Sequence, residues 1–268
     1  MKYLGSLFLC LFLLSSCLSD EEKRLQTDQN FEGEEIFNLT FSLDENIPYA
    51  FQPFEFYRDT LNHSTISGCP IVNINETTKE VILTFGEGEC ASNKALRSGK
   101  IRLSYVDSIG VNQVRMAYDN YWVKGIKVAG NRILEKIDST ASQLTLLDSV
   151  SGFVITDANR STSKMEGIFT HDLVLANDSI QYFTTTGAGS GRNLAGRHFE
   201  MEIIQAKQFL GDCLRTGFQV AESGKERWIF ERTVEANVIH TVDFQKAEDC
   251  NNSVKILLYN GDELLKTQ

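Results

Sequence analysis

The sequence has few of the residues from which metal and redox sites are built. It contains four histidines, far apart along the chain, and no H-x-H or H-E-x-x-H spacing, which zinc enzymes usually show. It also lacks a C-x-x-C pair and a D-x-D-x-D-G calcium loop. The segment Gly187–Gly191 is not a nucleophile elbow, because Ala188 stands where G-x-S-x-G requires glycine. We therefore predict no catalytic residue, no metal and no cofactor, and interpret this segment as a mobile glycine-rich loop.

Positive charge is scarce as well. The chain has 26 lysines and arginines against 36 aspartates and glutamates, a formal net charge of −10. An acidic chain of this kind is repelled by nucleic acid and by anionic membrane surfaces. The sequence shows no basic stretch with interleaved aromatic residues. We therefore exclude nucleic acid as a partner.

Proline is rare, with three residues that all precede position 71. From Glu35 onward, apolar and polar residues alternate between turn-forming Gly, Asn and Asp, which is the pattern of half-buried strands. This predicts an all-β fold, either an elongated antiparallel meander or an open curved sheet. The alternating segments are 36–43, 80–85, 100–106, 113–118, 127–134, 152–156, 179–186, 198–204, 227–234, 239–244 and 254–259.

No apolar run is long enough to stay in a membrane. The longest, Leu4–Leu14, spans 11 residues after Lys2, whereas a spanning helix needs about 20. It has the size of a signal-peptide core. Leu14, Ser15, Ser16 and Cys17 then match the lipobox of bacterial lipoproteins. That resemblance implies removal of residues 1–16 and attachment of the lipid to Cys17. The alternative is an ordinary secretory signal cut near Cys17.

Acidic residues follow this cysteine almost at once. Ser19, Asp20, Glu21 and Glu22 resemble the surface-export signal of lipoproteins of the Bacteroidota type. The other interpretation is a solvated tether, since clustered like charges favour extended chain. We interpret residues 17–34 as a flexible acidic tether under either reading. The expected location is the outer membrane, held by lipid and facing the cell surface, with a periplasm-facing protein as the alternative.

Beyond Cys17, four cysteines remain: Cys69, Cys90, Cys213 and Cys250. An even number in an oxidising compartment suggests disulfides, and four cysteines allow three connectivities. We favour Cys69–Cys90 and Cys213–Cys250, because each pair encloses a predicted strand-turn-strand unit. The sheet would then carry two disulfide-stapled hairpin modules. Free buried thiols are the alternative.

Four motifs resemble a family of uncharacterised Bacteroidota lipoproteins: C-P-x-V at 69–72, F-G-x-G-x-C at 85–90, R-S-G-K-I at 97–101 and D-N-Y-x-V-x-G at 119–125. The resemblance implies location and β architecture, without an activity. We divide the mature chain into an N-terminal β module, 35–135, and a C-terminal β module, 136–268, continuous with each other. The aromatic residues Tyr118, Tyr121 and Trp122 are packing residues in one interpretation and a ligand platform in the other.

The triplet Asp-Ser/Thr followed by an aliphatic residue or threonine occurs five times. It resembles the O-glycosylation site of Bacteroidota envelope proteins, although Asp-Ser and Asp-Thr also favour turns. The glycan acceptor candidates are Thr60, Ser108, Ser139, Ser149 and Ser179.

Taken together, these features predict an envelope lipoprotein with a binding or structural role. Its partners would be the membrane, through the N-terminal lipid, and a glycan or another envelope protein. A carrier of an apolar ligand on a curved sheet is the first alternative, and it requires an apolar concavity. A carboxylate-based hydrolase is the second, and it requires two carboxylates that converge in a cleft.

Overall fold

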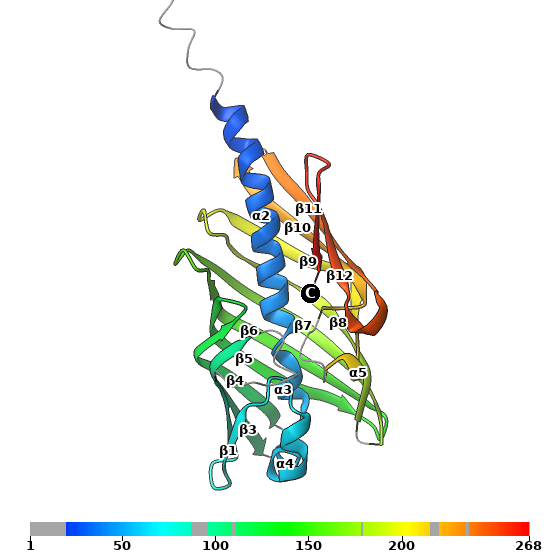
Figure 1. The fold of residues 1–268 in the computed structure, drawn as a ribbon. Helices are drawn as coiled ribbons and strands as arrows, with labels where there is room; N and C mark the ends of the chain where they lie inside the picture. Colours follow the sequence, from blue (N-terminus) through cyan, green and yellow to red (C-terminus); the bar gives the residue numbers. More distant parts are fainter. Residues whose placement is uncertain are drawn as a thin grey trace, which may run out of the picture.

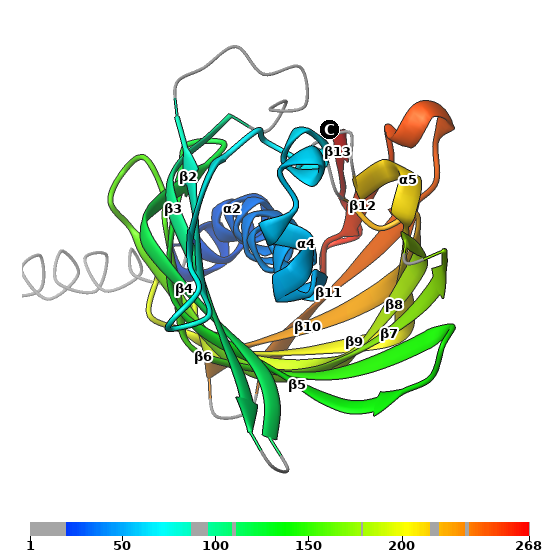
Figure 2. The same cartoon turned by 90° about the horizontal axis from the view of Figure 1, so that it is seen from below.

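The computed structural model describes residues 20–86, 96–108, 111–177, 179–214, 220–233 and 236–267. Its 13 strands form one sheet in which each strand lies beside the next strand of the chain, in antiparallel pairs (Figure 1). The fold class predicted from alternation is therefore confirmed. Figure 2 shows the sheet curved into an arc around the N-terminal helices.

The strands follow one another without a crossover. They are β1 (Ile71–Asn75), β2 (Glu80–Phe85), β3 (Arg97–Ser108), β4 (Val111–Val123), β5 (Ile126–Ser139), β6 (Gln143–Thr156), β7 (Thr162–Ala176), β8 (Ser179–Arg192), β9 (His198–Leu210), β10 (Ser223–Thr233), β11 (Ala236–Gln245), β12 (Ser253–Leu257) and β13 (Glu263–Thr267). The helices are α2 (Asp20–Asp44), α3 (Ile47–Phe51), α4 (Phe54–Arg58), the 3-10 helix η1 (Thr60–Thr65), α5 (Gly211–Leu214) and the 3-10 helix η2 (Glu248–Cys250).

Helix α2 replaces two predicted features. The flexible tether predicted for 17–34 is wrong from residue 20 onward, and the strand predicted for 36–43 is wrong as well, because both lie in this helix. The helix runs along the concave face of the sheet (Figures 1 and 2). All residues from Leu39 to Phe51 are buried. A helix that is enclosed on nearly every side shows no amphipathic stripe in its sequence. The alternation of apolar and polar residues at 36–43 therefore looked like that of a strand.

Glycines at bulges allow the sheet to curve. The register between β5 and β6 shifts at Gly130, whose φ is +119°, and a Cβ there would lie 2.5 Å from the carbonyl oxygen of Gly152. At Gly187 the register between β8 and β9 shifts in the same way, with φ +136°. A bulge increases local bending and twist. The glycine-rich segment Gly187–Gly191 thus belongs to β8 and is not the predicted loop.

The two predicted modules are parts of one sheet. Strand β5 runs through the predicted boundary after residue 135, and it pairs with both β4 and β6. A single apolar core fills the space between the concave face and the helices. Aromatic contacts within this core join the helices to the sheet. The rings of Phe51 in α3 and Phe183 in β8, for example, lie 4.9 Å apart. The structure therefore positions any site on one continuous scaffold.

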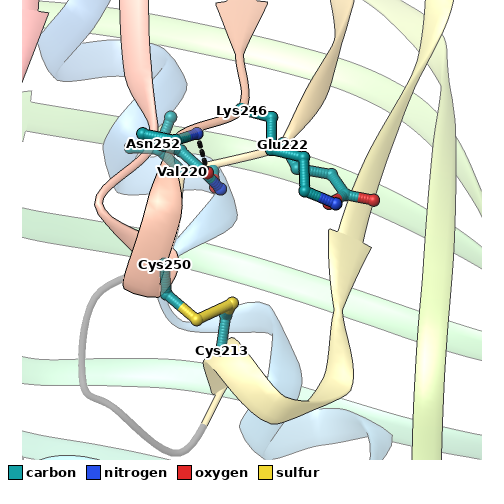
Figure 3. The surroundings of a disulfide bond; sticks show 7 residues. Cys213, Val220, Glu222, Lys246, Cys250 and Asn252 are labelled. Carbon is teal, nitrogen blue, oxygen red and sulfur yellow. Dashed lines mark hydrogen bonds and ion pairs between the residues drawn. A yellow bond between two sulfur atoms is a disulfide. The ribbon is translucent and has the colours of Figure 1, made fainter.

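The disulfide Cys213–Cys250 confirms one predicted pair, with an S–S distance of 2.01 Å (Figure 3). It joins α5 to η2 and encloses the β10–β11 hairpin. Closing a loop with a sequence separation of 37 residues stabilises the fold by about 4 kcal/mol in the chain-entropy account. Cys69 is disulfide-bonded as well. Its predicted partner, Cys90, lies outside the described residues, so that pairing stays a prediction.

Candidate functional site

Charged side chains line much of the space between α2 and the concave face of the sheet. A buried charge is costly unless it is paired and hydrogen-bonded, and here the carboxylates of the helical segment meet cations from the strands. We call this set the buried charged network. Its members are Glu32, Glu35, Asp44 and Glu45 from the helical side, and Arg97, Arg132, Asp148, His171, Arg197, Lys207, Glu226, Arg232 and His240 from the sheet side.

Lys207 stands at the centre of this network. Its Nζ lies 2.8 Å from both carboxylate oxygens of Asp44 and 2.8 Å from Oε1 of Glu226. The hydroxyl of Thr40 and the indole N–H of Trp228 donate to the other oxygen of Glu226, at 2.7 and 2.9 Å. Burial raises the pKa of Asp44 to about 6, against the opposing effect of Lys207. One lysine thus joins α2 to β9 and β10.

A second cluster surrounds Arg132. Its guanidinium binds Asp148 and donates to the carbonyl oxygen of Leu43 at 2.5 Å. His171 lies with Nε2 3.3 Å from Asp148 and Nδ1 2.9 Å from the hydroxyl of Thr185. Burial lowers the pKa of His171, which favours the neutral ring. Burial alone would raise the pKa of Asp148, but Arg132 and His171 lower it on balance.

The third cluster is nearest the start of α2. Glu32 lies 2.7 Å from Arg232, 3.1 Å from Nε2 of His240 and 3.4 Å from Arg197. One turn further, Glu35 accepts hydrogen bonds from the hydroxyl of Ser163 and from the backbone N–H of Leu194. Burial raises the pKa of Glu35 to about 7. Glu35 therefore changes its charge near neutral pH.

The network does not match the site that a hydrolase requires. Its carboxylates are closed off from solvent, and Asp148, Glu226 and Glu45 are each 0 % exposed. Within the described part of the chain, no network carboxylate lines the pocket beneath residues 50–55, the groove that extends from Ser149 to Ile229, or the hollow at residues 192–198. Among the described residues, no cluster of three or more His, Cys, Asp and Glu side chains could hold a metal ion. We therefore assign the network to holding α2 in place.

A pocket lies at the other end of the helical segment, where α2 gives way to short helices. We call residues 47–65, which include α3, α4 and η1, the cap. Between the cap and strands β3–β8 is a cavity of about 400 Å³, which we call the cap pocket. Its apolar lining is Ala50, Phe51, Pro53, Phe54, Tyr105, Val106, Val114, Leu134, Leu144, Leu146, Leu175 and Ile180, and its charged lining is Glu55, Lys79, Asp107 and Lys136.

Tyrosine hydroxyls and aromatic rings hold the cap over this pocket. Tyr105 donates to the carbonyl oxygen of Gln52 at 2.9 Å, and its ring lies 5.5 Å from that of Phe54. Within the cap, Tyr57 donates to the carbonyl oxygen of Tyr49 at 2.6 Å. Burial, and next the charge of Glu55, raises the pKa of Tyr105, so this hydroxyl stays a donor. Neutral contacts and one exposed ion pair, Arg58 with Glu76 at 2.8 Å, therefore attach the cap, whereas buried ion pairs attach α2.

The predicted aromatic platform is not assembled on one surface. Tyr118 donates to the side-chain oxygen of Asn46 at 2.8 Å, and Tyr121 donates to Glu45 at 2.8 Å. Both therefore face the interior. Trp122 follows on the strand and is half-buried, with Nζ of Lys127 5.8 Å from its ring centre. Adjacent residues of a strand face opposite sides, so the three do not form a common platform.

The glycan acceptor candidates occupy different environments. Thr60, Ser139 and Ser179 are exposed, Ser108 ends β3, and Ser149 is half-buried in β6. Their glycosylation stays a prediction. In the fourth triplet, Asp148 is fully buried against Arg132, so this aspartate has a structural role and is not presented at the surface.

The lipidation and export predictions fall at the edge of the described chain. Cys17 and Ser19 lie outside it, and Asp20, Glu21 and Glu22 form the beginning of α2. Among the described residues, no helix is both long enough and apolar enough to span a membrane. A scan against protein-family models found no match, and searches of curated proteins and solved structures found none either.

Sequence reasoning missed the network, although a signal for it exists. In β9, Lys207 is buried in the same phase as Phe209, and in β5 Arg132 is buried in the same phase as Leu134. A charge in phase with the apolar face of a strand requires a buried partner. Nothing in the strand itself says which element supplies that partner.

We predict that Arg132→Met lowers the free energy of unfolding by about 3–5 kcal/mol, because it leaves Asp148 buried without its guanidinium. Urea denaturation would measure the loss. The matched control is Arg102→Met, whose pair with Glu80 is partly exposed and contributes at most about 1 kcal/mol. Equal losses in the two variants would contradict the assigned role of the network.

We also predict an unusual pH dependence from Glu35. Its pKa rises from 4.5 to about 7 on folding, so the folded state holds the proton more tightly than the unfolded chain. The resulting stability is full below about pH 4.5 and is lost as the pH rises through 7. Glu35→Gln should therefore stabilise the protein by about 3 kcal/mol above pH 7, and by little in acid. Thermal unfolding against pH tests this, with the exposed neighbour Glu34→Gln as control.

Proposed function

We propose that this protein is a lipid-anchored envelope protein that binds a small apolar or amphipathic ligand in the cap pocket and catalyses no reaction. The single observation that carries the proposal is the cavity of about 400 Å³ between the cap and strands β3–β8. Small-molecule sites typically enclose about 300–1,000 Å³ and are mainly apolar with a few polar groups. The cap pocket matches this description.

The distribution of polar groups in the pocket favours an amphipathic ligand. Leu134 and Leu146 belong to the interior, where they are 1 % and 6 % exposed. Glu55 and Lys136, by contrast, are exposed, so charge is available where the cavity meets solvent. A molecule with an apolar body and a polar end would bury the first among the leucines and keep the second near these side chains.

The structure limits how much of the concave face a ligand can occupy. Helix α2 and the buried charged network fill the space beside β9 and β10. A carrier with one long apolar trough would need that space to be empty. The ligand we propose is therefore confined to the cap pocket and is small.

The anchor and the location rest on the sequence. Leu14, Ser15, Ser16 and Cys17 match a lipobox, and the acidic residues after it resemble a surface-export signal. Several acyl chains on one cysteine give stable anchoring, whereas a single chain does not. We therefore propose attachment to the outer membrane with the sheet facing the cell surface.

We predict that Leu144→Trp weakens binding of the amphipathic fluorophore anilinonaphthalene sulfonate at least about tenfold, because the indole fills the space that the aromatic body of the probe would occupy in the cap pocket. Fluorescence titration of the purified protein measures the affinity. Gln143→Trp is the matched control, since this neighbour in β6 is exposed and does not line the pocket. If both variants bind like the wild type, the pocket is not the site.

Cys17→Ala should abolish incorporation of radiolabelled palmitate into the protein in the bacterial cell, because the thiol that receives the lipid is gone. Gel fluorography of the immunoprecipitated chain measures the label. Cys10→Ala is the control, because that cysteine lies within the apolar run of the leader. Unchanged labelling of Cys17→Ala would refute the anchor.

A further inference from the structure

Charge is distributed unevenly over the hairpin turns at one end of the sheet: three adjacent turns are basic, whereas Glu231, Asp262 and Glu263 stand at or beside the next two, β10–β11 and β12–β13. Three hairpin turns, those between β4 and β5, β6 and β7, and β8 and β9, lie along one edge of the sheet beside the second half of α2, where Lys124 lies over the ring of Phe41 at 5.2 Å and Leu194 donates to Glu35. We call residues 124–128, 157–164 and 192–198 the basic rim. The sequence places six lysines and arginines there and a single acidic residue, Asp157. The basic residues are Lys124, Lys127, Arg160, Lys164, Arg192 and Arg197.

The opposite end of the same strands is acidic. Where β3 meets β4 and β5 meets β6, the residues are Asp107, Glu135 and Asp138, with Lys136 as the basic one. Asp212 follows at the end of β9. Although the net charge is −10, these strands therefore have basic residues at one end and acidic residues at the other. The repulsion expected from the whole chain does not describe the rim.

Two basic residues of the rim are placed in direct opposition. Lys164 of β7 and Arg192 of β8 are register partners, and both are exposed. Side chains that face each other across antiparallel strands lie about 5 Å apart at Cβ, and like charges in that position are destabilising. His198 continues the row as the register partner of Arg192. Such a row is stabilised when an anion lies over it.

The row opens into a hollow of about 750 Å³ on the neighbouring strands. Arg192, Arg197, His198 and Arg232 contribute basic groups to its lining, and Glu231 contributes the acid. Glu231 lies 3.1 Å from Nδ1 of His198, and Arg192 donates to the carbonyl oxygen of Gly196 at 2.9 Å. Of these basic groups, Arg197 and Arg232 are already paired with Glu32, so the hollow contributes mainly the exposed Arg192 to the positive charge of the rim.

We propose that the basic rim docks on the phosphate groups of anionic lipid headgroups in the membrane that holds the protein. The cations are spread over three successive turns and do not converge on one point. That arrangement fits a surface with many phosphates better than a single soluble anion. The proposal uses the predicted anchor for orientation, since Cys17 precedes the start of α2 by three residues.

The beginning of α2 supplies little of this attraction, because Lys23 and Arg24 are outnumbered by the three acidic residues before them. Asp20, Glu21 and Glu22 are acidic and stand beside the predicted lipid cysteine. They act against approach to an anionic surface, so the rim must overcome them. The rim would hold the sheet against the headgroups and direct the cap, at the far end of the helical segment (Figure 1), away from the membrane.

The test measures vesicle binding without the lipid anchor. The full chain with Cys17→Ala is mixed with phosphatidylcholine vesicles, with or without phosphatidylglycerol, and sedimented. The rim variant adds Arg160→Glu, Lys164→Glu and Arg192→Glu. The control variant adds Arg58→Glu, Arg102→Glu and Arg115→Glu, which change the net charge equally but lie outside the rim. The N-terminal apolar run is common to all samples and does not affect the comparison.

We expect the parent chain and the control variant to bind the anionic vesicles, and the rim variant to bind them about 100-fold more weakly. Each basic residue near an anionic surface contributes about a fivefold factor, and added salt should weaken the parent's binding. Equal losses in the rim and control variants would overturn the proposal, because net charge alone would explain them. So would a loss of binding by the rim variant that is as large on neutral vesicles as on anionic ones, or displacement by inorganic phosphate at constant ionic strength. None of these results depends on whether Cys17 is acylated or the cap pocket binds a ligand.

Discussion

The ion pairs between α2 and the concave face are the interaction on which the rest of the structure depends. A helix with buried Glu32, Glu35 and Asp44 would be expelled from an apolar interior, because each ionised carboxylate loses its hydration. The sheet compensates with Lys207, Arg232 and His240 at inward positions. Removing one partner leaves the other charged and buried, which costs more than the pair contributes. The helix and the sheet therefore specify each other.

This pairing also determines the shape of the sheet. An open meander must curve to reach a central helix from several strands, and curvature requires bulges. Two of these bulges lie at Gly130 and Gly187. Only glycine fits there, because φ is positive and the neighbouring backbone is too close for a side chain. The segment Gly187–Gly191, which looks like a loop in sequence alone, therefore contributes to the curvature that brings β8 and β9 around α2. The same curvature encloses the cap pocket at the far end.

The sequence predicted the strands and one disulfide because each signal is local. Alternation follows from which face of a strand is buried, and Cys213 and Cys250 stand on either side of a predicted hairpin. It did not predict α2, because Thr40, Ser42 and Asp44 are buried along with Phe41 and Leu43 and so remove the helical stripe. It did not predict the cap pocket either. Phe54, Tyr105 and Leu144 come from three distant segments, and only the closed fold shows that they share a cavity.

The two ways in which the helical segment is attached have different consequences for function. Charge-assisted contacts such as Lys207 with Asp44 are strong and fail together if one partner is lost. The cap is attached by neutral hydrogen bonds, such as that from Tyr105 to Gln52, each with a net contribution of about 1 kcal/mol, by ring contacts, and by the exposed ion pair of Arg58 with Glu76, which contributes at most about 1 kcal/mol. Regions of lower local stability open first. In the binding function that we propose, the cap is therefore the element expected to open for the ligand, while α2 and the network keep the sheet in shape around it.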